Sequence, residues 1–180
     1  MRELECKVRL SDPGALARRL EARGWERRGA VFEQNWLFDR AGELAARGEA
    51  LRLRVLDHGA GGLVTHKGPA RPGPFKDREE TQTLVADAAA MRAVFAAQGF
   101  VPVFYYEKRR AAWGSGACET VIDALPRLGD FAEVEAPDED ALRRALAELG
   151  LTDAEAVPAG YPTLAARLGL KELRFAEGEK

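Results

Sequence analysis

The chain contains 180 residues, a length typical of one domain with a sizeable core, so we expect a single domain over residues 1–180. Its 27 basic and 29 acidic residues leave a net charge of −2, which argues against a nucleic acid or a membrane surface as partner. The chain begins without a signal-like segment, and no apolar run reaches the length of a membrane span. We therefore expect a soluble cytoplasmic protein. Cys6 and Cys118 are too few for a disulfide framework.

The N-terminal half of the chain predicts mostly strands. A strand over residues 2–10 is followed by a helix over residues 11–23, which Ser11 or Asp12 would cap, with Pro13 in its first turn. Further strands are predicted over residues 31–39, 50–57 and 63–67, and the turn at 57–62 makes the last two a hairpin. The segment 68–77 contains three prolines and two glycines, so we expect a loop there.

The C-terminal half adds strands over residues 78–85, 103–113, 117–123 and 131–136. Helices are predicted over residues 87–98 and 138–149, each beginning at an aspartate, and a short helix is predicted near residues 162–168. Strands joined mostly by hairpins, with few helices, predict an antiparallel barrel or a strongly curved sheet. The expected fold class is α+β, with an eight-stranded antiparallel β-barrel and helices packed outside it.

Charged side chains share one face of most of these strands, because successive side chains on a strand point to opposite faces. The first strand places Glu3, Glu5, Lys7 and Arg9 on one face. The same alternation recurs in the later strands, at Arg52 and Arg54, Thr65 and Lys67, Lys108 and Arg110, Glu119 and Asp123, and Glu133 and Glu135. A solvated outer face explains one such strand. Its recurrence favours a charged barrel interior, with the apolar faces covered by helices from outside.

A closed interior that carries both acids and bases needs a ligand with negative charge and a metal. The basic set would bind linked phosphates, and it consists of Lys7, Arg9, Arg52, Arg54, Lys67, Arg78, Lys108 and Arg110. The acidic set would hold Mg²⁺ or Mn²⁺ through hard oxygen ligands, and it consists of Glu3, Glu5, Glu80, Asp123, Glu133 and Glu135.

Short motifs along nearly the whole chain follow one order: ELECK at 3–7, LRLR at 51–54, THKGP at 65–69, REE at 78–80, EKRR at 107–110, VID at 121–123, LGDFAEVE at 128–135 and GYPTL at 160–164. This set resembles the CYTH superfamily, the triphosphate tunnel metalloenzymes, and looks most like their class IV adenylyl cyclase branch. The resemblance implies an eight-stranded tunnel, one or two divalent metals and a triphosphate substrate. Gln82 is a departure, because members often carry a glutamate at that position.

The resemblance also implies roles for single residues. The expected metal ligands are Glu3, Glu5, Asp123, Glu133 and Glu135. The phosphate-binding residues that the resemblance implies are Lys7, Arg52, Arg54, Lys67, Lys108 and Arg110, and we add Arg78 from the basic set. The expected catalytic residues are Glu5, Lys7, Lys108 and Asp123. Tyr161 either closes one end of the tunnel or packs in the core.

Three functions are compatible with these residues. A triphosphatase would use a carboxylate-oriented water to attack the terminal phosphorus. An adenylyl cyclase would hold ATP in the same site, and the ribose 3′-hydroxyl would attack the α-phosphorus. A non-catalytic module would only bind a nucleotide or polyphosphate. The acidic set favours an enzyme, and we prefer the triphosphatase because it needs only what the residues supply. The expected partner is a small-molecule triphosphate, and a homodimer is left open.

Overall fold

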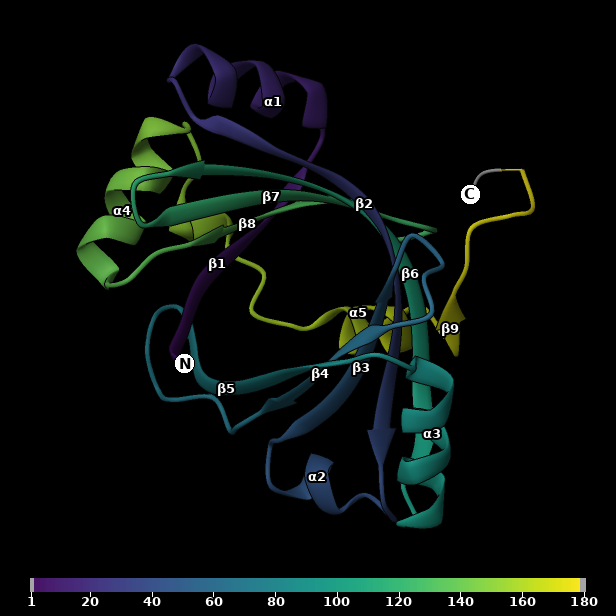
Figure 1. Cartoon of the computed structure of the whole chain (residues 1–180). Coiled ribbons are helices and arrows are strands. Elements are labelled where there is room, and N and C mark those ends of the chain that lie inside the picture. The colour runs from purple at the N-terminus through teal and green to yellow at the C-terminus, as the bar shows by residue number, and fades with distance from the viewer. Residues whose placement is uncertain (1, 179–180) are drawn as a thin grey trace.

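The computed structural model describes residues 2–178, in which an antiparallel sheet closes into an eight-stranded barrel (Figure 1). The order around the barrel is β2-β3-β4-β5-β1-β8-β7-β6, and β6 pairs with β2 to close it. The strands are β1 (Arg2–Leu10), β2 (Glu26–Asp39), β3 (Ala50–Leu56), β4 (Gly62–Lys67), β5 (Lys76–Val85), β6 (Val101–Ser115), β7 (Cys118–Leu125) and β8 (Gly129–Glu135). The predicted α+β barrel is confirmed.

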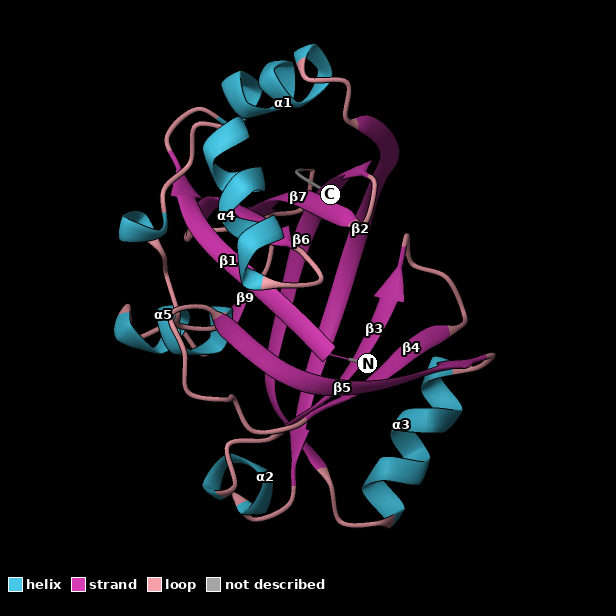
Figure 2. Cartoon of the chain, turned by 90° about the vertical axis from the view of Figure 1, so that its left-hand side faces the viewer, coloured by secondary structure: helices cyan, strands magenta, loops and turns pink. Residues whose placement is uncertain are grey.

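Helices cover the outside of this barrel (Figure 2). They are α1 (Pro13–Ala22), α2 (Glu43–Ala46), α3 (Ala88–Ala97), α4 (Glu139–Glu148) and α5 (Tyr161–Arg167), with a 3-10 turn at Asp153–Glu155. The carboxylates of Asp12, Asp87 and Asp138 accept backbone N–H bonds of 2.9, 2.9 and 2.7 Å from the first turns of α1, α3 and α4. These aspartates satisfy N–H groups that a helix leaves unpaired at its start. The three predicted helix starts are therefore confirmed.

The apolar faces of the strands pack beneath these helices. Leu4 and Val8 of β1 lie in one core cluster with Leu20 of α1 and Leu142 of α4. A second cluster joins β3 to α3, and a third contains α5 and the last strand, β9 (Glu172–Leu173), which runs parallel to β6. Burying one leucine side chain stabilises the folded protein by about 1.5–3 kcal/mol. Packing the apolar strand faces against the helices is therefore strongly favourable. The strand alternation then leaves the charged faces to the interior.

The structure extends several predicted elements. β2 begins at Glu26 rather than residue 31, because its polar, exposed N-terminal part pairs with the end of β6. The pairing has a register shift next to Gly29, which has a φ of 131°. This shift interrupts the alternation of side chains, so the sequence does not show that the strand begins before it. β5 begins at Lys76, inside the segment expected to be a loop. The two short elements α2 and β9 were not predicted.

None of the helices within residues 2–178 combines the length and the apolar character that crossing a membrane requires.

Candidate active site in the barrel interior

The inward faces of the strands surround a cavity of about 420 Å³. Every residue that the sequence assigned to the site lines this cavity, with the exception of Asp123. The reason is the strand alternation, which sends residues two apart to the same face. Arg9 of the broader basic set is exposed, and it donates to the carbonyl of Leu128 at 2.5 Å instead of lining the cavity.

Asp123 lies fully buried behind the cavity wall, and its carboxylate has four donors. It accepts bonds from Lys108 Nζ at 2.8 Å, from Arg110 Nε and Nη2 at 2.7 and 2.6 Å, and from Tyr161 Oη at 2.9 Å. These donors occupy both oxygens of the carboxylate. Asp123 is therefore placed to orient the lysine and arginine that bind it. Its assignment as a metal ligand stays a prediction.

Glu33 of β2 belongs to the same buried group but was not singled out from the sequence. Its carboxylate lies 3.1 Å from Arg54 Nε, 3.4 Å from Lys108 Nζ and 3.7 Å from Arg110 Nε. Burial would raise the pKa of Glu33, but the nearby positive charges outweigh it and lower the pKa to about 2. The sequence could have indicated Glu33 through its alternation with Asn35, since the two polar residues share one face of the strand. Asn35 is also buried and accepts a 3.0 Å bond from Arg54.

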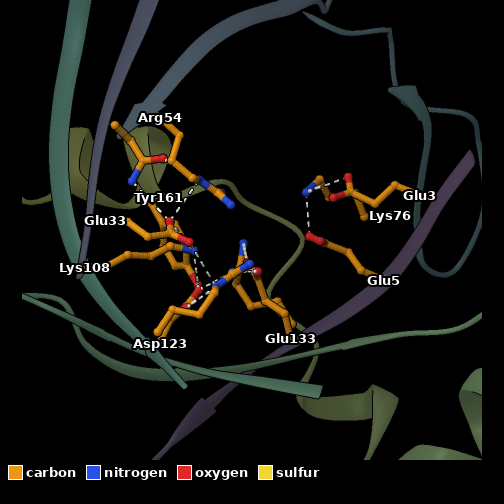
Figure 3. Close-up of polar contacts among 12 residues, drawn as sticks. Glu3, Glu5, Glu33, Arg54, Lys76, Lys108, Asp123, Glu133 and Tyr161 are labelled. Carbon is orange, nitrogen blue, oxygen red and sulfur yellow. Dashed lines mark hydrogen bonds and ion pairs between the residues drawn. The ribbon is translucent and has the colours of Figure 1, made fainter. Parts of the chain in front are cut away.

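Glu133 is also held among basic groups, 3.2 Å from Lys7 Nζ and 2.6 Å from Arg110 Nη2. Burial opposes ionisation of its carboxyl, but Lys7 and Arg110 hold its pKa well below the usual range. Figure 3 shows Glu33, Arg54, Lys108, Asp123, Glu133 and Tyr161 together on one side of the interior. Glu133 is therefore ionised and bound to cations of the wall, and its role as a metal ligand stays a prediction.

Three other carboxylates, of Glu3, Glu5 and Glu135, form a separate group that we call the carboxylate trio. One oxygen atom of each lies within 4.8 Å of the others. Burial, followed by the negative charges of Glu5 and Glu3, raises the pKa of Glu135 to about 8. Convergent carboxylate oxygens are the hard ligands that Mg²⁺ and Mn²⁺ bind, and a divalent cation would relieve this repulsion. The trio therefore fits such a metal.

Lys76 of β5 is a cavity residue that the sequence prediction missed, because it was assigned to a loop. Its ammonium lies 2.5 Å from Glu5 Oε1 and 3.8 Å from Glu3 Oε2 (Figure 3). Burial would lower the pKa of Lys76, but Glu5 and Glu3 outweigh it and raise the pKa. The side chain is therefore a permanent cation beside the trio.

Two arginines of the cavity wall have buried nitrogen atoms without a partner within the described range, namely Arg52 Nε and Arg78 Nε. Arg52 also donates through Nη2 to Thr65 Oγ1 at 3.2 Å. A buried donor left unpaired costs about 1–3 kcal/mol, which a phosphate oxygen in the cavity would offset. The arrangement can therefore bind an anion.

Tyr161 and Gln82 also line the cavity. Tyr161 lies at the start of α5, is buried, and both lines the cavity and packs on Phe131 with ring centroids 5.4 Å apart. Lys7 Nζ lies 4.3 Å from the centre of its ring. Gln82 donates to Glu80 at 3.1 Å, while Glu80 pairs with Lys67. Gln82 thus orients Glu80 rather than adding charge.

Comparisons with known proteins agree with this architecture. The CYTH domain family matches residues 1–161. A Methanocaldococcus jannaschii protein named "Putative adenylate cyclase" is 32% identical over 138 residues, which cover 75% of this chain and 77% of that protein.

Two solved structures share the fold. A Vibrio parahaemolyticus protein, also named as a "putative adenylate cyclase", has a TM-score of 0.79 and 23% identity over 91% of this chain and 97% of its own. The Hippeastrum protein HpAC1, described as a "Putative adenylyl cyclase" with a dominant triphosphatase activity, has a TM-score of 0.67 and 20% identity, with 93% and 96% coverage. From the family match and the archaeal relative, the chain belongs to the CYTH domain family.

Proposed function

We propose that this protein is a divalent-metal-dependent enzyme that hydrolyses a linear triphosphate inside its barrel. The observation that carries the proposal is one cavity lined both by three converging carboxylates and by a larger set of lysines and arginines. In Figure 3, Glu3 and Glu5 of the carboxylate trio lie on one side of the interior, and Arg54 and Lys108 lie on the other. We define the basic wall as Lys7, Arg52, Arg54, Lys67, Arg78, Lys108 and Arg110. A binder of polyanions alone would gain nothing from carboxylates beside phosphate, because like charges repel.

Glu3, Glu5 and Glu135 would hold the metal, and the basic wall would hold the phosphates. Bound Mg²⁺ or Mn²⁺ would supply neutralisation of phosphate charge. Arg52 and Arg78, with their unpartnered nitrogens, would donate to phosphate oxygens directly. Asp123 and Glu33 would orient Lys108 and Arg110, because both carboxylates contact both cations. Of the residues expected to be catalytic, Lys7 and Lys108 would contact phosphate, Glu5 would bind metal and Asp123 would position its neighbours.

In the proposed reaction, the oxygen of a water molecule bonds to the terminal phosphorus and the bridging P–O bond breaks. The products are orthophosphate and the shortened phosphate chain, and the water proton leaves to solvent or product. The seven side chains of the basic wall supply positive charge where the transition state spreads negative charge over the phosphate oxygens. No recognition of a base is needed for this chemistry.

The second candidate is an adenylyl cyclase, and the name of the archaeal relative favours it. In that reaction the ribose 3′-oxygen of ATP bonds to the α-phosphorus and pyrophosphate leaves. The name alone does not decide between the two, since the Hippeastrum neighbour carries a cyclase name and is described with dominant triphosphatase activity. The same basic wall would serve either reaction. A non-catalytic binding module is the third alternative.

Product analysis tests the proposal. The protein is incubated with tripolyphosphate or ATP, each with Mg²⁺ and with Mn²⁺, and the products are separated by anion-exchange chromatography. We expect orthophosphate from one or both substrates. Cyclic AMP with pyrophosphate would select the cyclase, and tight binding without turnover would select the binding module. Glu5→Gln serves as the matched control, because it preserves size but removes a charge that the metal needs. Orthophosphate release by the Glu5→Gln variant at the wild-type rate would point to a contaminating phosphatase.

A further inference from the structure

Lys76 places a cation of the chain itself at the carboxylate trio. It is the first residue of β5 and the direct cross-strand partner of Glu5. Partners on adjacent strands point to the same face, so both side chains enter the cavity side by side. The ammonium lies 2.5 Å from Glu5 and 3.8 Å from Glu3, and dashed lines in Figure 3 mark both contacts. Two of the three trio carboxylates therefore already have a positive partner.

Each of the other inward-facing lysines has at least one ion-pair partner outside the trio. Lys7 pairs with Glu133, Lys108 pairs with Asp123 and Glu33, and Lys67 pairs with Glu80 as well as Glu3. Among the lysines of residues 2–178, only Lys76 forms all of its ion pairs with members of the trio. Its position is thus specific to the proposed metal site and is not a general feature of the wall.

We propose that Lys76 is a built-in competitor of the divalent cation. In the substrate-free protein its ammonium neutralises Glu5 and Glu3, and it must withdraw before a metal binds there. This inference rests on the metal site of the proposed function. The reason is electrostatic, because a Mg²⁺ or Mn²⁺ ion bound about 2.1 Å from Glu5 Oε1 would compete with the ammonium for that oxygen and repel its positive charge. The flexible four-carbon side chain of lysine allows the withdrawal.

Triphosphate gives the displaced ammonium a new partner. Lys76 lines the same cavity as the basic wall, so its side chain can move from the trio toward a bound phosphate. Binding of triphosphate then makes the trio available to the metal, and by linkage the metal strengthens binding of triphosphate to the same degree. The protein would load metal and substrate together and would bind metal alone only weakly.

The test measures Mn²⁺ affinity of the substrate-free full-length protein, from the paramagnetic resonance signal of free Mn²⁺. Lys76→Met keeps a side chain of similar length but removes the charge, whereas Lys76→Arg keeps the charge. Lys171→Met is the control, because it removes an exposed lysine outside the cavity. We expect Lys76→Met to bind Mn²⁺ at least about ten-fold tighter than wild type, the factor that corresponds to one decade in Kd. Lys76→Arg and Lys171→Met should bind like wild type.

A second titration adds imidotriphosphate, a hydrolysis-resistant triphosphate. Wild type should gain Mn²⁺ affinity, and Lys76→Met should gain less because Glu5 has already lost its ammonium partner. Equal Mn²⁺ affinity in wild type and Lys76→Met, or weaker binding in Lys76→Met, would overturn the role of Lys76 while leaving the metal site intact. Mn²⁺ binding that Glu5→Gln and Glu135→Gln leave unchanged would overturn the trio as metal site, and the role of Lys76 with it. Thermal melting of each variant verifies folding.

Discussion

Arg110 and Asp123 form a bidentate ion pair inside the barrel, with Nε 2.7 Å from Oδ1 and Nη2 2.6 Å from Oδ2. The two residues are direct partners on β6 and β7, so backbone pairing fixes their spacing. The same carboxylate also accepts a bond from Lys108. Asp123 therefore fixes the direction of two cations of the basic wall, which gives it a role distinct from that of the trio.

Asp123→Asn tests this distinction. Loss of the charge removes charge-assisted bonds worth about 1.5–3 kcal/mol, so we expect kcat/KM for triphosphate to fall by about ten-fold to a hundred-fold. Mn²⁺ affinity should stay at the wild-type value in this variant and should fall in Glu5→Gln. Asp140→Asn, an exposed change on α4, serves as control. A large loss of Mn²⁺ affinity in Asp123→Asn would restore the sequence-based assignment of Asp123 as a metal ligand.

Arg78→Met should weaken substrate binding without destabilising the protein. The buried Arg78 Nε has no hydrogen-bond partner among the described residues, so removing it breaks no hydrogen bond of this atom. We expect KM for triphosphate to rise by about ten-fold, because a charge-assisted phosphate contact contributes roughly 1.5–3 kcal/mol. The melting temperature should not fall. Arg71→Met is the matched control, since Arg71 is exposed and pairs with Asp77 and Glu79 outside the cavity. An unchanged KM in Arg78→Met would contradict phosphate contact.

Arg110→Ala and Arg109→Ala test the strand alternation directly. Arg110 faces the cavity, whereas Arg109 faces outward over the ring of Phe175. Arg110→Ala should lower kcat/KM by at least about ten-fold and should also lower the melting temperature, because Asp123 and Glu133 lose a buried partner. Arg109→Ala should leave steady-state kinetics near wild type. Equal damage from both substitutions would mean that the inward phase of β6 is misassigned.

Glu33→Gln should reveal the buried acid as a pH-dependent source of stability. The surrounding cations lower the pKa of Glu33 in the folded protein from its usual 4.5 to about 2. A depressed pKa means that the stabilisation is present above pH 4.5 and is lost as pH falls toward 2. Breaking such a buried pair costs about 3–5 kcal/mol. The melting-temperature difference between wild type and Glu33→Gln should therefore be large at neutral pH and shrink below pH 4.5. A difference that is constant with pH would argue against the ion pairs.

The length of the phosphate chain should determine affinity. A wall of basic residues from several strands contacts each added phosphate with further cations. We expect tripolyphosphate to bind at least about ten-fold tighter than pyrophosphate, a difference of about 1.4 kcal/mol. Calorimetric titration in Ca²⁺ measures both. If the protein is a cyclase, ATP should instead bind better than both GTP and tripolyphosphate. Equal affinity for one, two and three phosphates would indicate a general anion surface.

The alternation of charged and apolar residues determined much of the fold. Because side chains of a strand alternate with a period of two, the sequence alone placed Glu3, Glu5 and Lys7 on one face, and Leu4 and Cys6 on the other. Cys6 indeed lies in the core beneath the outer helices. The ordered motifs added the barrel and the family.

Tertiary structure alone decided how the charges are grouped. Glu3 and Glu135 are 132 positions apart in the printed sequence, and Glu135 joins Glu3 and Glu5 of β1 only because β1 pairs with β8. Asp123 and Glu133 look like Glu135 in sequence, yet closed pairing surrounds them with lysine and arginine. Lys76 and Glu33 gained their roles from partners on other strands. Strand periodicity fixes the face of a side chain, whereas its charged neighbours depend on register and on closure of the barrel, which are non-local.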